Sequence, residues 1–286
     1  MQKFSLLMMP DGRHVRVREL GPGHGSPVVH LHGIPGACIE FAHHEPVLVD
    51  LDVRLISIER PGYGGSDPND LESIAAWVED LISVADTLQL DRFRLLGFSG
   101  GGVFALAGAA ALPARVDRVS VVGCPAPFTG PEFLDGMAPQ NRALWMLARE
   151  GHAALSAALA PMASDPSALA DQLLEGLPTA DVAVFADSEA RANFSRALID
   201  GLRQGVGGTA RDLALIATPW GFDLSQVTQP VEIWHGDADR NIPVNHGVRL
   251  SEAWPRARTH VWSGRGHYEV YASTSFEQVF GSLNPI

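Results

Sequence analysis

The stretch at residues 93–112 constrains the fold more than any other part of the chain. An apolar run at 93–96 leads into the turn Gly97-Phe98-Ser99-Gly100-Gly101, and a long alanine-rich segment follows. This order predicts a buried strand, a sharp turn and a buried helix, with Ser99 at the apex of the turn. Glycines flank Ser99 because side chains there would clash as strand and helix close together. The N-terminus of the helix offers free N–H groups to a developing anion.

Two interpretations of Ser99 are open from this pattern alone. A Gly-x-Ser-x-Gly turn between a strand and a helix is typical of a nucleophilic serine held at the edge of a sheet. A hydroxyl in a glycine-rich turn explains the same residues equally well, since a short motif is a hypothesis until its structural context agrees. The rest of the chain has to decide between the two.

The composition describes a globular chain with an acidic surface. Of 286 residues, 46% are hydrophobic and 19% are charged, which suits a large packed core. A net charge of −12 argues against nucleic acid as a partner, because phosphate backbones would be repelled. The apolar runs are too short to span a bilayer, and the N-terminal run lacks the features of a secretory signal. We expect a cytoplasmic protein without membrane association, in which Cys38 and Cys124 are buried free thiols.

Strands and helices alternate along the first part of the chain. After a β-hairpin at 4–18, the apolar patterns predict strands at 28–32, 54–58, 93–96 and 116–122, with helices at about 37–49 and 71–88 and after the Ser99 turn. Such alternation predicts an α/β fold in which a mostly parallel, doubly wound sheet carries helices on both faces. The almost continuously apolar strands agree with burial on both sides.

The alternation stops at residues 127–224. This stretch shows no strong strand and is rich in Ala and Leu, and it predicts helices at 140–159, 166–174 and 190–202. We expect an all-helical insertion into a core made of residues 1–126 and 225–286. The α/β pattern resumes in the second core segment, with a strand at 231–235, a helix at 245–254, a strand at 259–262 and a helix at 273–280.

Nucleophilic chemistry at Ser99 needs a base, an acid that orients the base, and donors for an oxyanion. In a parallel sheet these groups belong on loops that follow the carboxyl ends of strands. His267 is the candidate base because it lies in a glycine-flanked loop after the last expected strand, although one of 11 histidines is more often structural. Asp237 and Asp239 follow the strand at 231–235 and are the candidate acids. Solvated turn carboxylates are the alternative interpretation of both.

The chain order of serine, acid and histidine matches that of the α/β-hydrolases, and the sequence resembles this superfamily over essentially its whole length. The resemblance rests on five segments, which are His32-Gly33-Ile34-Pro35-Gly36, Arg60-Pro61-Gly62-Tyr63-Gly64-Gly65-Ser66, the turn at Ser99, the HGxxDxxxP pattern at 235–243, and Gly266-His267. It implies that Asp239 is the catalytic acid, that the N–H groups of Ile34 and Gly100 form the oxyanion hole, and that the insertion is a cap. Glu59 stands where the family commonly has Asp, and we expect it to be structural.

The resemblance implies a serine hydrolase that cleaves an ester or related acyl bond of a small, largely apolar substrate through an acyl-enzyme on Ser99. A serine at this turn argues against the dehalogenase and epoxide hydrolase chemistries, for which the family uses Asp there. Two alternatives remain. One is a receptor-like protein that binds a ligand with little turnover, and the other is a C–C hydrolase, a lyase or a transferase that uses the same triad.

The pocket residues are the least constrained expectation. Phe98 beside the nucleophile and Trp145, Met146 and Phe185 of the insertion are expected to line the substrate pocket, although packing inside the cap is the favoured interpretation of Trp145 or Met146 taken alone. No cofactor is implied. His30 and His32 share one face of a strand, but no carboxylate or cysteine cluster matches them, so a metal site is not expected. The pair His43-His44 is expected at the surface or facing the cap, without a role.

Overall fold

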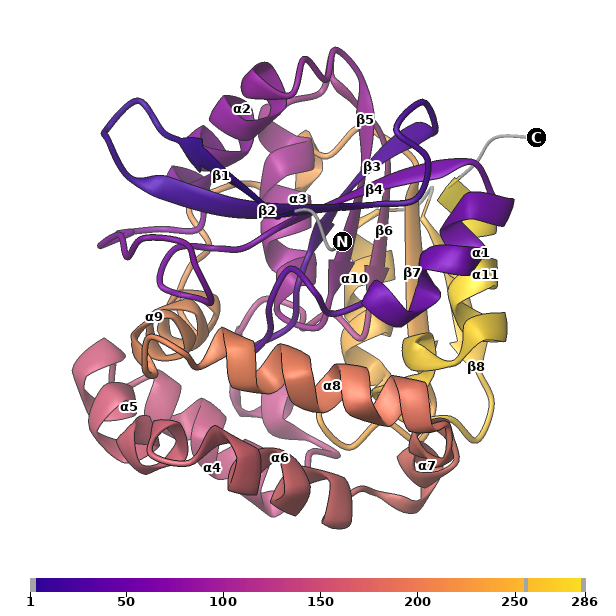
Figure 1. The fold of residues 1–286 in the computed structure, drawn as a ribbon. Helices are drawn as coiled ribbons and strands as arrows, with labels where there is room; N and C mark the ends of the chain where they lie inside the picture. Colours follow the sequence, from indigo (N-terminus) through magenta and orange to yellow (C-terminus); the bar gives the residue numbers. More distant parts are fainter. Residues whose placement is uncertain (1–3, 255–256, 284–286) are drawn as a thin grey trace.

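The computed structural model describes residues 4–254 and 257–283, and an eight-stranded sheet forms its centre (Figure 1). The strands run in the order β1-β2-β4-β3-β5-β6-β7-β8. Pairs β1–β2 and β2–β4 are antiparallel, and every other pair is parallel. The predicted, mostly parallel α/β sheet is therefore confirmed. The strands are β1 (Phe4–Met8), β2 (His14–Leu20), β3 (Ser26–Leu31), β4 (Val53–Ile58), β5 (Phe93–Phe98), β6 (Val116–Val122), β7 (Val231–Gly236) and β8 (Arg258–Trp262).

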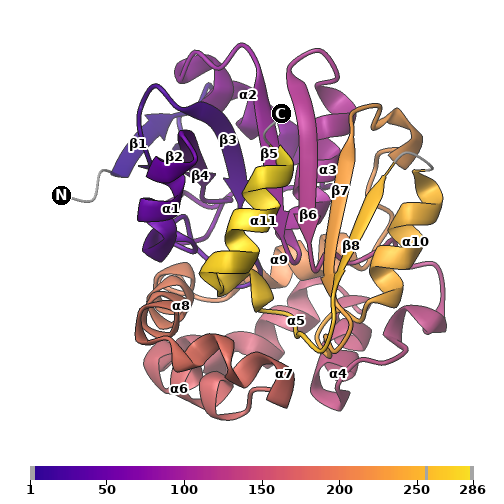
Figure 2. The same cartoon turned by 90° about the vertical axis from the view of Figure 1, so that its right-hand side faces the viewer.

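Helices cover both faces of the sheet (Figure 2). Helices α1 (Glu45–Asp50) and α11 (Ser273–Leu283) pack on one face. Helices α2 (Val78–Thr87), α3 (Gly101–Ala111) and α10 (Asn245–Ala253) pack on the other. Helix α3 is buried on almost every side, which explains why its sequence is apolar throughout instead of amphipathic. It starts at Gly101, two residues after Ser99, so an almost fully buried helix supports the turn that carries Ser99.

The chain between β6 and β7 forms the expected all-helical insertion. Residues 127–224, which the structure describes in full, contain helices and no strand. The insertion lies across the end of the sheet at which the parallel strands finish (Figure 1). Its α-helices are α4 (Pro139–Ala148), α5 (His152–Leu159), α6 (Pro166–Glu175), α7 (Thr179–Val182), α8 (Ser188–Gly201) and α9 (Gly207–Ile216).

Several helix boundaries differ from the prediction. Residues 37–41 form a loop before a short 3-10 turn and α1, because Glu40 turns inward and accepts the Gly33 N–H. The helix expected over 140–159 is broken at Gly151, whose φ of +105° suits glycine alone. Helix α9 was not predicted, since two glycines begin it. Gly208 is needed there because a Cβ would lie 2.9 Å from the Tyr63 ring.

One further helix boundary differs from the prediction. The helix expected at 71–88 begins as a 3-10 turn at Ala75–Trp77 before α2.

Both cysteines are buried and free, as predicted. Within the two described ranges, no helix is long and apolar enough to cross a membrane.

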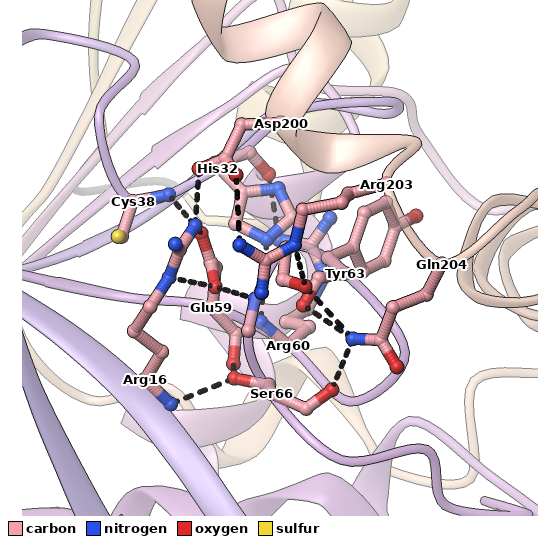
Figure 3. A network of polar contacts seen from close by, with 12 residues as sticks. Arg16, His32, Cys38, Glu59, Arg60, Tyr63, Ser66, Asp200, Arg203 and Gln204 are labelled. Atoms are coloured by element: carbon pink, nitrogen blue, oxygen red, sulfur yellow. Dashed lines mark hydrogen bonds and ion pairs between the residues drawn. The ribbon is translucent and has the colours of Figure 1, made fainter.

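A polar network at the turn after β4 joins the core to the insertion (Figure 3). Glu59 is fully buried, pairs with Arg16, and accepts the N–H groups of Cys38 and Gly65 at 3.1 and 2.8 Å. Arg16 also pairs with Asp200 at the end of α8. The expected structural role of Glu59 is thus visible in its contacts.

The segment that follows α8 is held by the same turn. Gln204 donates to the carbonyl oxygens of Gly64 and Ser66 at 2.9 and 2.8 Å, and Arg203 donates to Gly64 at 3.2 Å. Figure 3 shows these side chains converging on the turn. The junction of α8 and α9 is therefore fixed to the core by many polar contacts.

Candidate active site

Ser99 occupies a strained turn between β5 and α3. Its φ is +52°, in the left-handed region that few non-glycine residues adopt. A Cβ at Gly97 would lie 2.4 Å from Gly102 Cα, and one at Gly101 would lie 2.1 Å from the Leu31 carbonyl oxygen. The glycines are therefore required for this close packing, as the sequence predicts. The turn presents the Ser99 hydroxyl beyond the carboxyl end of β5.

His267 connects Ser99 to Asp239. The Nε2 atom of His267 lies 3.0 Å from Ser99 Oγ, and its Nδ1 atom lies 2.6 Å from Asp239 Oδ2. Because an ionised carboxylate only accepts hydrogen bonds, Nδ1 carries the proton and Nε2 is free to accept the Ser99 hydroxyl proton. The three residues follow β5, β7 and β8. Three separate loops at one edge of the sheet thus bring the predicted side chains together.

Asp239, and not Asp237, contacts the histidine. Asp239 is buried, and its Oδ1 atom accepts the N–H groups of Asn241 and Ile242 at 2.8 and 2.9 Å, which leaves Oδ2 facing His267. Asp237 is exposed and accepts the Gly264 N–H at 2.6 Å. Two backbone donors thus fix the Asp239 carboxylate in the orientation that holds the imidazole.

The electrostatic surroundings favour a protonated His267. Burial is the largest single influence and acts to lower its pKa, whereas the charge and hydrogen bond of Asp239 act in the opposite direction. The carboxylates of Asp181 and Glu40 add to this effect, and the pKa of His267 is raised above its ordinary value of 6.5. A base of this kind is stabilised in the imidazolium form that it adopts after it removes a proton.

The candidate oxyanion donors lie next to Ser99. Gly100 precedes α3, and Ile34 lies in the loop after β3, so close that a Cβ at Gly100 would be 2.3 Å from Ile34 Cδ1. Within the described ranges, neither N–H donates to another residue. The Ile34 loop is fixed by Glu40, whose carboxylate accepts the Gly33 N–H at 3.1 Å, and by His32, whose Nδ1 donates to the Gly33 carbonyl at 2.8 Å. Two backbone amides beside Ser99 thus have no acceptor in the described part of the chain, and they remain the candidate oxyanion donors.

A cavity of about 50 Å³ lies beside Ser99. The predicted Phe98 lines it, together with Ile34 and His267. The insertion closes it with Leu173 of α6 and with one face of α8. Sequence reasoning missed that face, although its spacing of i, i+3 and i+4 is the usual signal of a shared helix face. The lining residues that the sequence did not single out for the pocket are Gly33, Pro35, Glu40, Leu173, Phe194, Ala197, Leu198, Tyr268 and Tyr271.

The expected pocket residues of the insertion lie elsewhere. Trp145 and Met146 are not among the residues that line the cavity. Helix α4 packs on α5 and α9, so Trp145 is buried against Phe133 with ring centroids 5.1 Å apart, and Met146 is half exposed. Phe185 lies behind the lining, where its ring contacts Phe194. The expectation for Trp145 and Met146 is therefore corrected in favour of packing and surface roles.

Buried histidines near the site have structural partners. His30 lies between Ser57 and Glu40 at 3.0 and 3.1 Å. His43 and His44 were expected at the surface or facing the cap. The 3-10 turn that carries them packs against α8 of the insertion, which agrees with the second alternative, and His44 is buried instead of lying at the surface. His43 Nε2 contacts a backbone carbonyl of the loop after His267, and His44 stacks on the core, where burial lowers its pKa to about 2. In the part of the chain that the structure describes, no group of three or more His, Cys, Asp or Glu side chains is arranged to hold a metal ion.

Comparison with known proteins agrees with this geometry. The chain matches the profile of the alpha/beta hydrolase family over residues 28–280. It is 27% identical to a 2-hydroxy-6-oxononadienedioate/2-hydroxy-6-oxononatrienedioate hydrolase of Cupriavidus pinatubonensis, covering 89% of this chain and 84% of the relative. It is also 27% identical to a 2-hydroxy-6-oxo-2,4-heptadienoate hydrolase of Pseudomonas putida, covering 92% and 89%.

Solved structures share the fold. The crystal structure of the esterase RhEst1 from Rhodococcus sp. ECU1013 superposes with a TM-score of 0.72 at 23% identity and covers 98% of both chains. The chain belongs to the alpha/beta hydrolase family and is a hydrolase.

Proposed function

We propose that the protein is a serine hydrolase in which Ser99 is the nucleophile, His267 the base and Asp239 the orienting acid. Ser99 Oγ attacks a carbonyl carbon while His267 Nε2 removes its proton. The N–H groups of Ile34 and Gly100 stabilise the resulting oxyanion, and each such donor contributes about 3 kcal/mol to lowering the barrier. His267 then protonates the leaving group, and water releases the acid from Ser99. The hydrogen-bonded series Asp239, His267 and Ser99 is the observation that carries this proposal.

We further propose that the helical insertion, residues 127–224, acts as a cap on a core of residues 1–126 and 225–286. Cavities that bind small-molecule ligands usually measure about 300–1,000 Å³, whereas the cavity at Ser99 measures about 50 Å³. A substrate therefore enters only after α6 and α8 move away from the core. The same closure then keeps bulk water away from Ser99 until the leaving group has been expelled and has left the cavity.

The cavity favours a neutral, largely apolar substrate. Its lining residues, all of which the structure describes, include no Lys or Arg. The carboxylate that it does contain is Glu40, which is 2% exposed. A substrate carboxylate would lose its hydration without gaining a cation and would face a like charge. We therefore place neutral esters, thioesters and lactones before acidic substrates.

Cleavage of a carbon–carbon bond is the second candidate, and the names of the curated relatives favour it. Those proteins are named for dienedioate, trienedioate or dienoate substrates, all of which carry carboxylates. The absence of Lys and Arg from the described cavity lining argues against these acids as substrates here. A neutral 1,3-diketone would fit the same triad and the same cavity.

Labelling with a fluorophosphonate probe and mapping of the adduct test the nucleophile. We expect an adduct on Ser99 in the wild type, none on Ser99→Ala, and much slower labelling of His267→Ala. Ser167→Ala, which changes an exposed serine of α6, is the control and should label normally. No labelling of the wild type, together with tight reversible ligand binding, would favour a receptor-like protein.

Matched substrates test which class of substrate the enzyme prefers. A p-nitrophenyl butyrate ester and the corresponding p-nitrophenyl hemisuccinate differ by one carboxylate, and we expect kcat/KM to favour the neutral ester by at least roughly tenfold. A 2-hydroxy-6-oxo-dienoate serves as the carbon–carbon substrate. If the enzyme prefers that acid to both esters, the assignment moves to C–C hydrolase.

A further inference from the structure

A buried carboxylate of the helical insertion lies against the loop that carries His267. Asp181 belongs to α7 and is fully buried. Its Oδ1 atom accepts the backbone N–H of Tyr268 at 2.8 Å. Ser99, Asp239 and His267 all come from the core. Asp181, in contrast, is a carboxylate of the insertion that lies close to the base, His267.

Gly266 makes this approach possible. A Cβ at Gly266 would lie 2.3 Å from the Asp181 carboxylate, so a side chain there would displace Asp181 from its present position. The glycine that precedes His267 is therefore needed to admit the carboxylate of another segment against the backbone. Burial raises the pKa of Asp181, while the N–H groups of Tyr268 and His267, which face this carboxylate, act to lower that pKa less strongly.

We propose that Asp181 is a positioning residue, which clamps the backbone of residues 266–268 when the insertion closes and thereby places His267 between Ser99 and Asp239. This proposal rests on the serine hydrolase mechanism proposed above. Three carboxylates face His267 from three segments, namely Asp239 after β7, Asp181 on α7 and Glu40 after β3. Each of them stabilises the imidazolium that forms when His267 takes the Ser99 proton.

The two ends of α8 explain why closure and positioning are coupled. Figure 1 shows α8 spanning the insertion from α7 to the segment that leads into α9. At the α9 end, Asp200 and Gln204 belong to the dense polar network with the core (Figure 3). At the α7 end, Asp181 meets the His267 loop. An opening movement that pivots at the network would withdraw Asp181 from the loop, so the base would be fully positioned only in the closed state.

Two variants of Asp181 separate the clamp from the charge. Asp181→Asn keeps an acceptor for the Tyr268 N–H but removes the negative charge, and Asp181→Ala removes both. We expect Asp181→Ala to lower kcat/KM by roughly 10- to 100-fold through misplacement of the base. We expect Asp181→Asn to keep more activity and to shift the acid limb of kcat/KM to lower pH by roughly half a unit to one unit, because one of three facing charges is lost.

The matched control is Asp187→Asn, which removes a charge from an exposed carboxylate at the start of α8 and keeps a good helix cap. We expect it to retain the wild-type rate and pH profile. Thermal melting of every variant monitors folding. Asp181→Asn should melt no lower than the wild type, because a carboxyl whose pKa is raised by burial destabilises the folded state at neutral pH.

Gly266→Ala completes a double-mutant cycle. If the new methyl group acts by displacing Asp181, Gly266→Ala should lower kcat/KM about as much as Asp181→Ala, and the double variant should lose little more than either single variant. Fully multiplicative losses, or Asp181 variants that match Asp187→Asn in rate and pH profile, would overturn the proposal. Absence of fluorophosphonate labelling in the wild type would instead overturn the underlying serine mechanism.

Discussion

The guanidinium of Arg60 and the carboxylate of Asp212 form an ion pair that water does not reach. The Arg60 Nε atom lies 2.6 Å from Asp212 Oδ2, and both side chains are fully buried. Arg60 also donates to the carbonyl oxygens of His32 and Gly33 at 2.6 and 3.1 Å. Helix α9 of the insertion is thereby tied to the loop that carries Ile34, so the candidate oxyanion hole depends on a contact between core and insertion.

Removing one partner of this pair should be strongly destabilising. Asp212→Asn would leave the Arg60 charge buried without compensation, and we expect a loss of about 3–5 kcal/mol in the free energy of unfolding. Urea denaturation measures this loss in the free energy of unfolding. Asp117→Asn is the control, since Asp117 pairs with Arg92 at the exposed surface and such pairs contribute little. Equal losses in the two variants would contradict a special role for the buried pair.

The two acids after β7 should differ widely in their effect on turnover. Asp239→Asn would remove the charge that holds the His267 Nδ1 proton, and we expect kcat to fall by roughly 10³- to 10⁴-fold, as is usual when a triad acid becomes an amide. Asp237→Asn would affect only an exposed contact with the Gly264 N–H. Steady-state kinetics on one neutral ester compares them. A larger loss from the Asp237 change would reverse the assignment of the acid.

Activity should fall in acid because His267 must be neutral to accept the Ser99 proton. Burial acts to lower its pKa, but Asp239, Asp181 and Glu40 raise it to a value above 6.5. The active form therefore predominates above that raised pKa and is lost as pH decreases through it. The acid limb of kcat/KM in the free enzyme reports this value. A flat profile between pH 5 and 8 would show that His267 is not the base.

The site residues that the sequence predicted are those tied to local backbone geometry. The turn at Ser99 is predictable because β5 and α3 pack so closely that the flanking positions must be glycine. Asp239 and His267 are predictable because each follows a strand that the apolar pattern indicates. Residues whose role depends on distant packing were missed. Phe194 and Asp181 reach the site only through the way the insertion folds onto the core.

The errors have the same physical origin. Trp145 was expected in the pocket because large apolar side chains often line one, but hydrophobicity alone does not tell which face of a helix meets the core. Helix α9 was hidden by its two glycines, which close packing against Tyr63 requires. The inward turn of Glu40 replaced the first part of the predicted helix at 37–49 with a loop.

Two aromatic residues of the insertion should differ in effect: one should mainly stabilise the fold, and the other should mainly determine which acyl chains the enzyme accepts. Trp145→Ala would open a hole in the core next to Phe133, and we expect a loss of about 3–5 kcal/mol in the free energy of unfolding with little change in acyl preference. Phe194→Ala would enlarge the cavity beside Ser99, because its ring lines that cavity.

The readout is the ratio of kcat/KM for an octanoate ester to that for a butyrate ester of the same alcohol. We expect this ratio to rise by about 4- to 15-fold in Phe194→Ala, corresponding to one or two additional buried methylene groups at about 0.8 kcal/mol each. Met146→Ala is the control, since its side chain is half exposed and lies outside the cavity lining. If Trp145→Ala changed the ratio as much as Phe194→Ala does, α4 would have to contribute to the pocket in the open state. The separation of packing from specificity would then be wrong.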